Sequence, residues 1–189
     1  MGYSTDFFGR FELNKELDDE MFNFLKAFND TRRMKRNLDG FGIEGEFYVG
    51  EETIGSIIDE YKPPSTQPSS FCQWTPTEDR KGIEWDEGEK FDYYTEWLVY
   101  LVNKILAPNG YVLNGTIEWE GDDRDDRGKI IVKDNKVFLK QGRIKEEATP
   151  ENSVKWDLEY SLRYENYMEI GTTLVFGEST GDKDKFGSI

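Results

Sequence analysis

The chain has 189 residues, a size that suits one domain, and its 39 acidic against 24 basic residues give a formal net charge of -15. This charge argues against a protein that holds nucleic acid or anionic lipid by electrostatic attraction, because phosphate groups would repel it. The sequence has no histidine and one cysteine, which excludes histidine-based catalytic triads, histidine-ligated zinc, cysteine clusters and internal disulfides.

The N-terminal segment has no cationic stretch followed by an apolar run. The longest apolar run, residues 97–102, is too short to cross a bilayer. The single cysteine, Cys72, has aromatic neighbours, which favours a small core residue over a nucleophile. We therefore expect a cytoplasmic protein without a membrane segment.

The predicted elements begin with a strand over residues 6–13, whose apolar side chains alternate. A helix over residues 15–28 follows, because its apolar residues recur with helical spacing, and Asn14 is its predicted N-cap. Alternation over residues 43–49 then predicts a second strand.

Three prolines between residues 62 and 70 predict a loop. Short strands are predicted over residues 71–75 and 83–85. The second predicted helix, residues 91–106, carries the clearest apolar stripe of the chain and stops at a Pro-Asn-Gly turn.

The rest of the chain alternates in the manner of strands, and Asp134 and Asn135 form the turn of a predicted hairpin. The strands are predicted over residues 111–120, 129–133, 136–140, 156–162 and 168–174. This order predicts an α+β fold, a mainly antiparallel sheet with two helices on one face. We expect one domain over residues 1–177 and a polar C-terminal tail over residues 178–189. The side chains expected between helices and sheet include Phe24, Phe28, Trp97 and Leu101.

Acidic side chains form two patterns that bear on binding. The pairs Glu44/Glu46 and Glu118/Glu120 are spaced i, i+2 on predicted strands. Each pair therefore projects to one side about 6.6 Å apart, comparable to the spacing of successive phosphates on a nucleic-acid strand. The acidic run continues after Glu120 with Asp122, Asp123, Asp125 and Asp126. These residues form either a solvated sheet face or a phosphate-mimicking face that binds a basic protein surface.

Carboxylates beside tryptophan suggest a different chemistry. Hydrolysis without histidine needs two carboxyl groups across a cleft, and a tryptophan can stack on a sugar ring. The candidate residues for a hydrolase or glycan-binding site are Glu84, Trp85, Asp86, Glu118, Trp119 and Glu120. The competing interpretation is that both tryptophans belong to the core and the acids are exposed.

The acidic turn over residues 122–128 partly matches a calcium-binding loop. Asp123, Asp125 and Gly128 occupy loop positions that calcium loops use, but Arg127 stands where an oxygen ligand is needed. We therefore expect no metal site, and no calcium dissociation constant below about 10 µM. The sequence also lacks a glycine-rich phosphate loop, so no cofactor is expected.

One basic cluster stands out in this acidic chain: Arg32, Arg33, Lys35 and Arg36. It follows the first predicted helix, where cations favour the helix dipole. The alternative is a patch that binds an anion or the acidic surface of a partner.

Several sequence blocks, in order, resemble a family of small acidic proteins found in bacterial and phage genomes. The blocks are TRRMKR (31–36), GIEGEFYVG (42–50), PPSTQPS (63–69), CQWTPTED (72–79), IEWDEGEKF (83–91), GYVLNG (110–115) and EWEGDDRDDRGKIIVKDN (118–135). The resemblance covers roughly residues 1–140. It implies no catalytic residue and no named function, but it implies a context of phage-borne or mobile accessory genes, where such proteins inhibit host or competitor machinery.

The leading hypothesis is a non-catalytic binding protein that presents a nucleic-acid-mimicking acidic face to a basic host or defence protein. The alternatives are a carboxylate-based hydrolase or glycan-binding protein, and a structural or assembly protein of a phage particle. We expect no direct contact with nucleic acid or a membrane, and the oligomeric state is left open.

Overall fold

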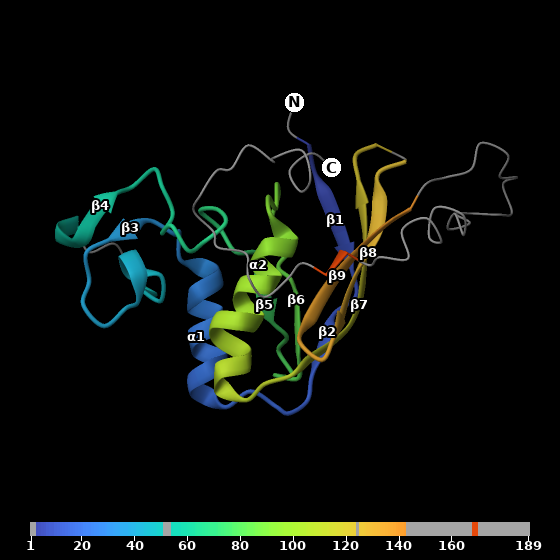
Figure 1. Cartoon of the computed structure of the whole chain (residues 1–189), viewed down its shortest axis with the longest axis horizontal. Coiled ribbons are helices and arrows are strands. Elements are labelled where there is room, and N and C mark those ends of the chain that lie inside the picture. Colours follow the sequence, from blue (N-terminus) through green and yellow to red (C-terminus); the bar gives the residue numbers. More distant parts are fainter. Residues whose placement is uncertain (1–2, 51–53, 124, 143–167, 170–189) are drawn as a thin grey trace, which may run out of the picture.

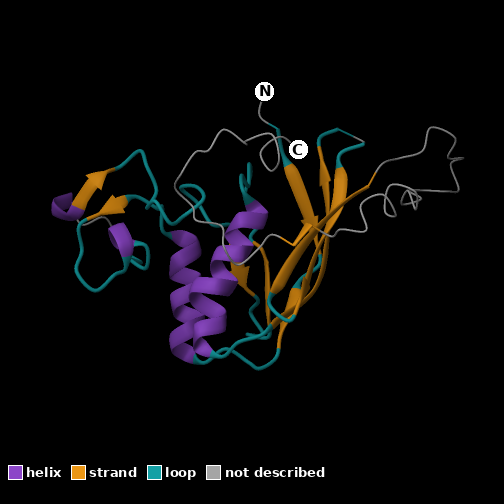
Figure 2. Ribbon diagram, viewed as in Figure 1, coloured by secondary structure: helices purple, strands orange, loops and turns teal. Residues whose placement is uncertain are grey.

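The computed structural model describes residues 3–50, 54–123, 125–142 and 168–169. It has an α+β fold in which both helices lie on the same side of an antiparallel sheet, as predicted (Figures 1 and 2). The helices are α1 (Asp19–Asp30) and α2 (Tyr94–Tyr100), and α2 continues through a π-helical turn (Leu101–Leu106) and a 3₁₀ turn (Ala107–Asn109). The strands are β1 (Thr5–Phe8), β2 (Phe11–Leu13), β3 (Lys35–Arg36), β4 (Ile57–Asp59), β5 (Trp74–Pro76), β6 (Gly82–Trp85), β7 (Leu113–Gly121), β8 (Arg127–Lys133), β9 (Lys136–Gly142) and β10 (Met168–Glu169).

The main sheet of the described chain has the strand order β10-β9-β8-β7-β2-β6-β5, and β1 also pairs with β7. Strands β3 and β4 form a separate small ladder. The strand predicted over residues 6–13 lies in the expected place but is interrupted at Gly9, whose φ of 108° suits glycine. Before this kink, β1 pairs with β7. After it, β2 pairs with both β7 and β6, whereas β6 does not pair with β1. The sheet therefore opens between β1 and β6.

Helix α1 starts later than predicted, and Asn14 is not its N-cap. The cap is Asp18, whose Oδ1 accepts a hydrogen bond from the Met21 N–H at 2.8 Å. The Asn14 side chain instead accepts from the Val112 N–H at 2.8 Å and joins the chain before α1 to the segment before β7. Asparagine and aspartate are both common N-caps, so the sequence alone did not distinguish Asn14 from Asp18. Leu17, which lies between them in the chain, is buried in the core.

The strand predicted over residues 43–49 is wrong. This segment begins with a 3₁₀ turn, Ile43–Gly45, in which Glu44 has a φ of 52°. Gly42, Gly45 and Gly50 also have positive φ, so the backbone reverses repeatedly instead of extending. The alternation of apolar and acidic residues here reflects a compact loop around buried groups.

The core lies between the helices and the sheet. The two helices contribute Phe28, Trp97 and Leu101, which are buried as predicted, and Phe24 packs against this core as a partly buried side chain. The facing sheet contributes Phe7, Phe11, Ile83, Leu113, Ile117, Trp119, Ile130 and Val132. Leu113, Ile117 and Trp119 lie at alternate positions of β7 and are buried, as expected for a strand with one face against the core.

Strands β8 and β9 form the predicted hairpin through Asp134 and Asn135, both with positive φ, which is typical of a type I′ turn. Strand β10 pairs with β9, so the predicted strand at residues 168–174 is described only at its start. The strand predicted over residues 156–162 and the tail over residues 178–189 lie outside the described residues. Within the described chain, no helix combines the length and apolar character needed to cross a bilayer.

Candidate functional site

Glu118 and Glu120 lie on the face of β7 opposite the buried Trp119, as the alternation predicts. Both carboxylates meet cations of the neighbouring strand: Glu118 pairs with Lys129, and Glu120 pairs with Arg127 at 3.3 Å. The side chains remain 58% and 51% exposed. Their charge is thus partly balanced within the sheet itself, which weakens their field toward a partner.

Glu44 and Glu46 do not extend this face. Glu46 is buried, and its carboxylate accepts hydrogen bonds from the Thr66 hydroxyl at 2.7 Å and the Tyr100 hydroxyl at 3.0 Å. Glu44 pairs with Lys35 at 2.9 Å and accepts from the Ser65 N–H. The prediction that both project from an exposed strand is wrong, because the loop turns Glu46 inward, where polar donors replace water.

The turn between β7 and β8 carries the four aspartates of the acidic run. Asp122 accepts a hydrogen bond from the Ser4 N–H at 2.8 Å, and Asp126 accepts one from the Tyr3 hydroxyl. Burial and the bond to Asp126 raise the pKa of Tyr3 to about 12. Asp123 and Asp125 are exposed. Among the described residues no group of three or more potential ligand side chains could hold a metal ion, and the absence of tight calcium binding stays a prediction.

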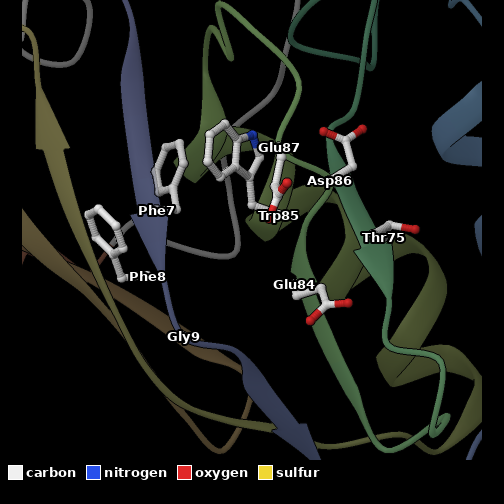
Figure 3. Close-up of a pocket in the computed structure, with 8 residues that line it drawn as sticks. All are labelled: Phe7, Phe8, Gly9, Thr75, Glu84, Trp85, Asp86 and Glu87. Atoms are coloured by element: carbon white, nitrogen blue, oxygen red, sulfur yellow. The ribbon is translucent and has the colours of Figure 1, made fainter.

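A cavity of about 450 Å³ lies where the sheet opens between β1 and β6. Figure 3 shows the Phe7 and Trp85 rings side by side at this opening, with Glu84, Asp86 and Glu87 on the β6 side. The Phe7 and Trp85 rings meet edge to face at a centroid distance of 5.4 Å. The remaining lining residues are Phe8, Gly9 and Thr75. This opening combines aromatic surface with three carboxylates.

Two of these carboxylates differ in how firmly they are held. Asp86 accepts hydrogen bonds from the Asn29 side chain at 2.7 Å and the Gly88 N–H at 2.8 Å. Glu87 is exposed and has a φ of 63°. Across the cavity, Phe8 is 54% exposed although it is a large apolar side chain. Sequence reasoning identified Glu84, Trp85 and Asp86, but it missed Glu87 and Phe8. Phe8 was missed because only the kink at Gly9 places β1 opposite β6.

The β7–β8 turn lies at the end of the molecule at which β1 begins and the chain enters α2 (Figure 1). The cavity is near this turn, because β1 lines the cavity and pairs with β7 up to Gly121. Tyr94 connects them: its ring packs on Phe7 at 4.9 Å and on Trp119 at 6.0 Å. Burial, and next the nearby Asp126 carboxylate, raise the pKa of Tyr94. We name this region the acidic end and define it as Asp6, Glu84, Asp86, Glu87, Glu120, Asp122, Asp123, Asp125 and Asp126.

The basic cluster is not the surface patch that the sequence suggested. Arg33 and Arg36 are each only 2% exposed, Arg32 is exposed, and Lys35 is paired with Glu44. The Arg33 guanidinium stacks on Phe28 at 4.3 Å, and burial lowers the pKa of Arg33 to about 10. The cluster lies beyond the last turn of α1, which contains no basic residue, so it does not cap that helix.

Two further interpretations depend on burial. Trp119 is 1% exposed and cannot stack on a sugar, which leaves Trp85 as the only one of the two candidate tryptophans at a cavity. Cys72 is fully buried, as predicted for a small core residue, and burial raises the pKa of its thiol to about 12. Comparison with known proteins finds no matching family model, curated protein or solved structure.

Proposed function

We propose that this chain is a non-catalytic binding protein that attaches to a basic protein surface through its acidic end. One observation carries the proposal: acidic segments that are far apart in sequence, around residues 84–87 and 120–126, converge on one end of the sheet. Most carboxylates there are exposed, and clustered like charges create a field that steers a cationic partner toward the surface.

The cavity between β1 and β6 supports the same proposal. Protein interfaces derive most of their affinity from a few anchors in desolvated pockets, while surrounding charges mainly set orientation and association rate. Here the exposed ring of Phe8 and the face of Trp85 supply apolar contact, and Glu84 and Glu87 supply charge. A lysine or arginine side chain of the partner fits this combination, because its stem is apolar and its head is cationic.

The class of partner follows from charge and from the family resemblance. A surface that attracts basic proteins competes for the sites at which those proteins bind nucleic acid. The resemblance to small acidic proteins of bacterial and phage genomes supports an inhibitor of a basic host or defence protein. The partner is accordingly a nucleic-acid-binding or defence protein whose site the acidic end occupies.

The test measures association with a basic partner, isolated by pull-down from host lysate, at about 50 and about 500 mM salt. Reversing Asp123 and Asp125 to Lys, or Glu84 and Glu87 to Lys, should slow association by about tenfold. Reversing Glu118 and Glu120 to Lys should slow it less, because these carboxylates are balanced by Lys129 and Arg127.

A matched control reverses Glu16 and Asp39 to Lys, since both are exposed acids outside the acidic end. This variant carries the same change in net charge and should associate at nearly the wild-type rate. A binding constant that does not change with salt, or equal slowing in the control, would contradict the proposal.

A second candidate function is glycan binding or hydrolysis, and it is favoured by the carboxylates beside half-buried Trp85 in the cavity. Titration with soluble oligosaccharides, followed by tryptophan fluorescence, distinguishes it from protein binding. A saturable change that is lost in Trp85→Ala would support this candidate, whereas no change would leave the acidic end as a protein-binding surface.

A further inference from the structure

A second cavity, of about 510 Å³, lies beside the C-terminal end of α1 and shares no lining residue with the first. Ala27 and Met34 form apolar parts of its wall, and Asp30, Arg32 and Arg36 are its charged residues. The Thr31 hydroxyl donates to the Ala27 carbonyl and accepts from the Gly50 N–H, which closes the wall between α1 and the loop before residue 51.

Arg36 is the unusual residue of this cavity. It is 2% exposed, its guanidinium lies 4.4 Å from the centre of the Tyr48 ring, and its Nη1 is buried without a hydrogen-bond partner. In the part of the chain that the structure describes, no carboxylate forms an ion pair with it. A buried cation without a counter-charge is strongly disfavoured, so a compensating anion is expected.

A second buried cation reinforces this requirement. Arg33 is equally buried, and its Nε and Nη1 also lack hydrogen-bond partners, while its Nη2 donates to the Tyr48 carbonyl. Arg36 is close enough to lower the pKa of Arg33, an effect smaller than that of burial. The two guanidinium groups therefore repel each other, and both contact Tyr48, Arg33 at its carbonyl oxygen and Arg36 at its ring. An anion near Arg36 would relieve this repulsion.

We propose that the cavity beside α1 is a binding site for the oxyanion group, carboxylate or phosphate, of a small ligand. Arg36 binds the oxyanion from inside the cavity, and Arg32 binds it from the rim. The planar guanidinium donates two parallel hydrogen bonds to such a group, and its stacking on Tyr48 holds it in position. The exposed carboxylate of Asp30 opposes an anion, but the two arginines outweigh it.

The site is independent of the acidic end, because an anion is the opposite of the ligand proposed there. In a chain with a net charge of -15, an oxyanion enters only where cations are concentrated. The apolar wall formed by Ala27 and Met34 leaves room for a small organic body attached to the oxyanion.

The test follows the arginine Nε–Hε signals of the full chain by ¹⁵N NMR during titration with inorganic phosphate and, separately, acetate. Chloride keeps the ionic strength constant. We expect a saturable shift of the Arg36 signal with a millimolar dissociation constant, roughly 1–10 mM for so small a probe. A response to phosphate alone assigns a phosphoryl ligand, and a response to acetate alone assigns a carboxylate ligand.

Two variants and one control complete the test. Arg32→Gln changes an exposed side chain and should weaken binding about fivefold to tenfold without affecting the fold. Arg36→Lys keeps the charge but loses the planar group and should abolish saturation. If Arg36→Lys does not fold, Arg32→Gln still decides the matter. The control, Lys104→Gln, removes an exposed cation that does not line the cavity and should bind as wild type. No saturable shift with either anion, or equal affinity in Arg32→Gln and wild type, would overturn the proposal.

Discussion

Trp97 is fully buried in the contact between α1 and α2. Its ring meets Phe28 at 6.0 Å and Tyr100 at 5.5 Å, and its indole N–H donates to the Ser69 hydroxyl at 2.8 Å. We expect Trp97→Ala to lower the free energy of unfolding by about 3–5 kcal/mol in a denaturant titration, because the truncation leaves a cavity and removes the hydrogen bond to Ser69. Tyr61→Ala is the control, since Tyr61 is 78% exposed and its loss should cost under about 0.5 kcal/mol. A loss below about 1 kcal/mol for Trp97→Ala would contradict this role.

Asp79 makes the fold sensitive to acid. Hydrogen bonds from the Thr77 hydroxyl at 2.6 Å, Arg10 at 2.7 Å and the Lys81 N–H at 3.1 Å hold the pKa of Asp79 well below its usual range. Because the folded state favours the charged form, this stabilisation is complete above the ordinary carboxyl value of about 3.9. It is lost progressively as the pH falls from there toward the lower folded pKa.

Asp79→Asn should therefore lower the melting temperature at pH 7, and its difference from wild type should shrink below about pH 4. Arg10→Gln removes only one of the three donors and should show a smaller effect of the same sign. Thermal unfolding followed by circular dichroism from pH 7 to pH 2 provides the measurement. Parallel curves of melting temperature against pH for Asp79→Asn and wild type would show that these hydrogen bonds do not lower the pKa of Asp79.

At the level of elements, the side chain of Asn135, in the turn of the β8–β9 hairpin, contacts the start of β7 and the residues before it. The Asn135 Oδ1 accepts from the Leu113 N–H at 2.7 Å, and its Nδ2 donates to the Tyr111 carbonyl at 3.0 Å. Its φ of 66° would suit glycine equally well. The hydrogen bonds, and not the backbone conformation alone, therefore explain why asparagine serves here.

Asn135→Gly keeps the turn conformation but loses both hydrogen bonds, so it should lower the free energy of unfolding by about 1 kcal/mol. Asn135→Ala loses the same bonds and also strains a positive φ, so it should cost more. Denaturant titration of the two variants separates the contributions. If Asn135→Gly were more stable than wild type, the link to β7 would contribute nothing.

For the whole molecule, the net charge of -15 opposes compaction through mutual repulsion of the acidic groups. Raising the salt concentration from about 0.01 M to about 0.15 M shortens the screening length from about 30 Å to about 8 Å. We expect the melting temperature to rise by about 2–4 °C, equivalent to about 1 kcal/mol for a chain of this length. The variant with Asp123→Asn and Asp125→Asn should rise less, because it starts with less repulsion. A fall with added salt would show instead that exposed pairs such as Arg10–Asp79 dominate the electrostatic stability.

Local patterns were sufficient to predict the parts of the fold that depend on one face being buried. The stripe through Trp97 and Leu101 predicts α2, the alternation through Ile117 and Trp119 predicts β7, and both buried faces are confirmed. The reason is that a helix or strand repeats its side-chain directions with a fixed period, so burial of one face leaves a regular trace in the sequence. The same kind of pattern wrongly predicted a strand over residues 43–49. Glycines with positive φ reverse the backbone there without changing the alternation of apolar and polar residues.

The candidate sites depend on contacts that have no such period. Glu46 and Glu118 carry the same charge and the same local spacing, yet one is enclosed by Thr66 and Tyr100 and the other is exposed on β7. Arg36 looked like part of a surface cluster, and packing against Tyr48 placed it inside a cavity. The acidic end likewise exists because the kink at Gly9 separates β1 from β6 while β7 returns beside β1. Charge can be counted along a chain, but which charges meet, and how much water remains around them, depends on long-range packing.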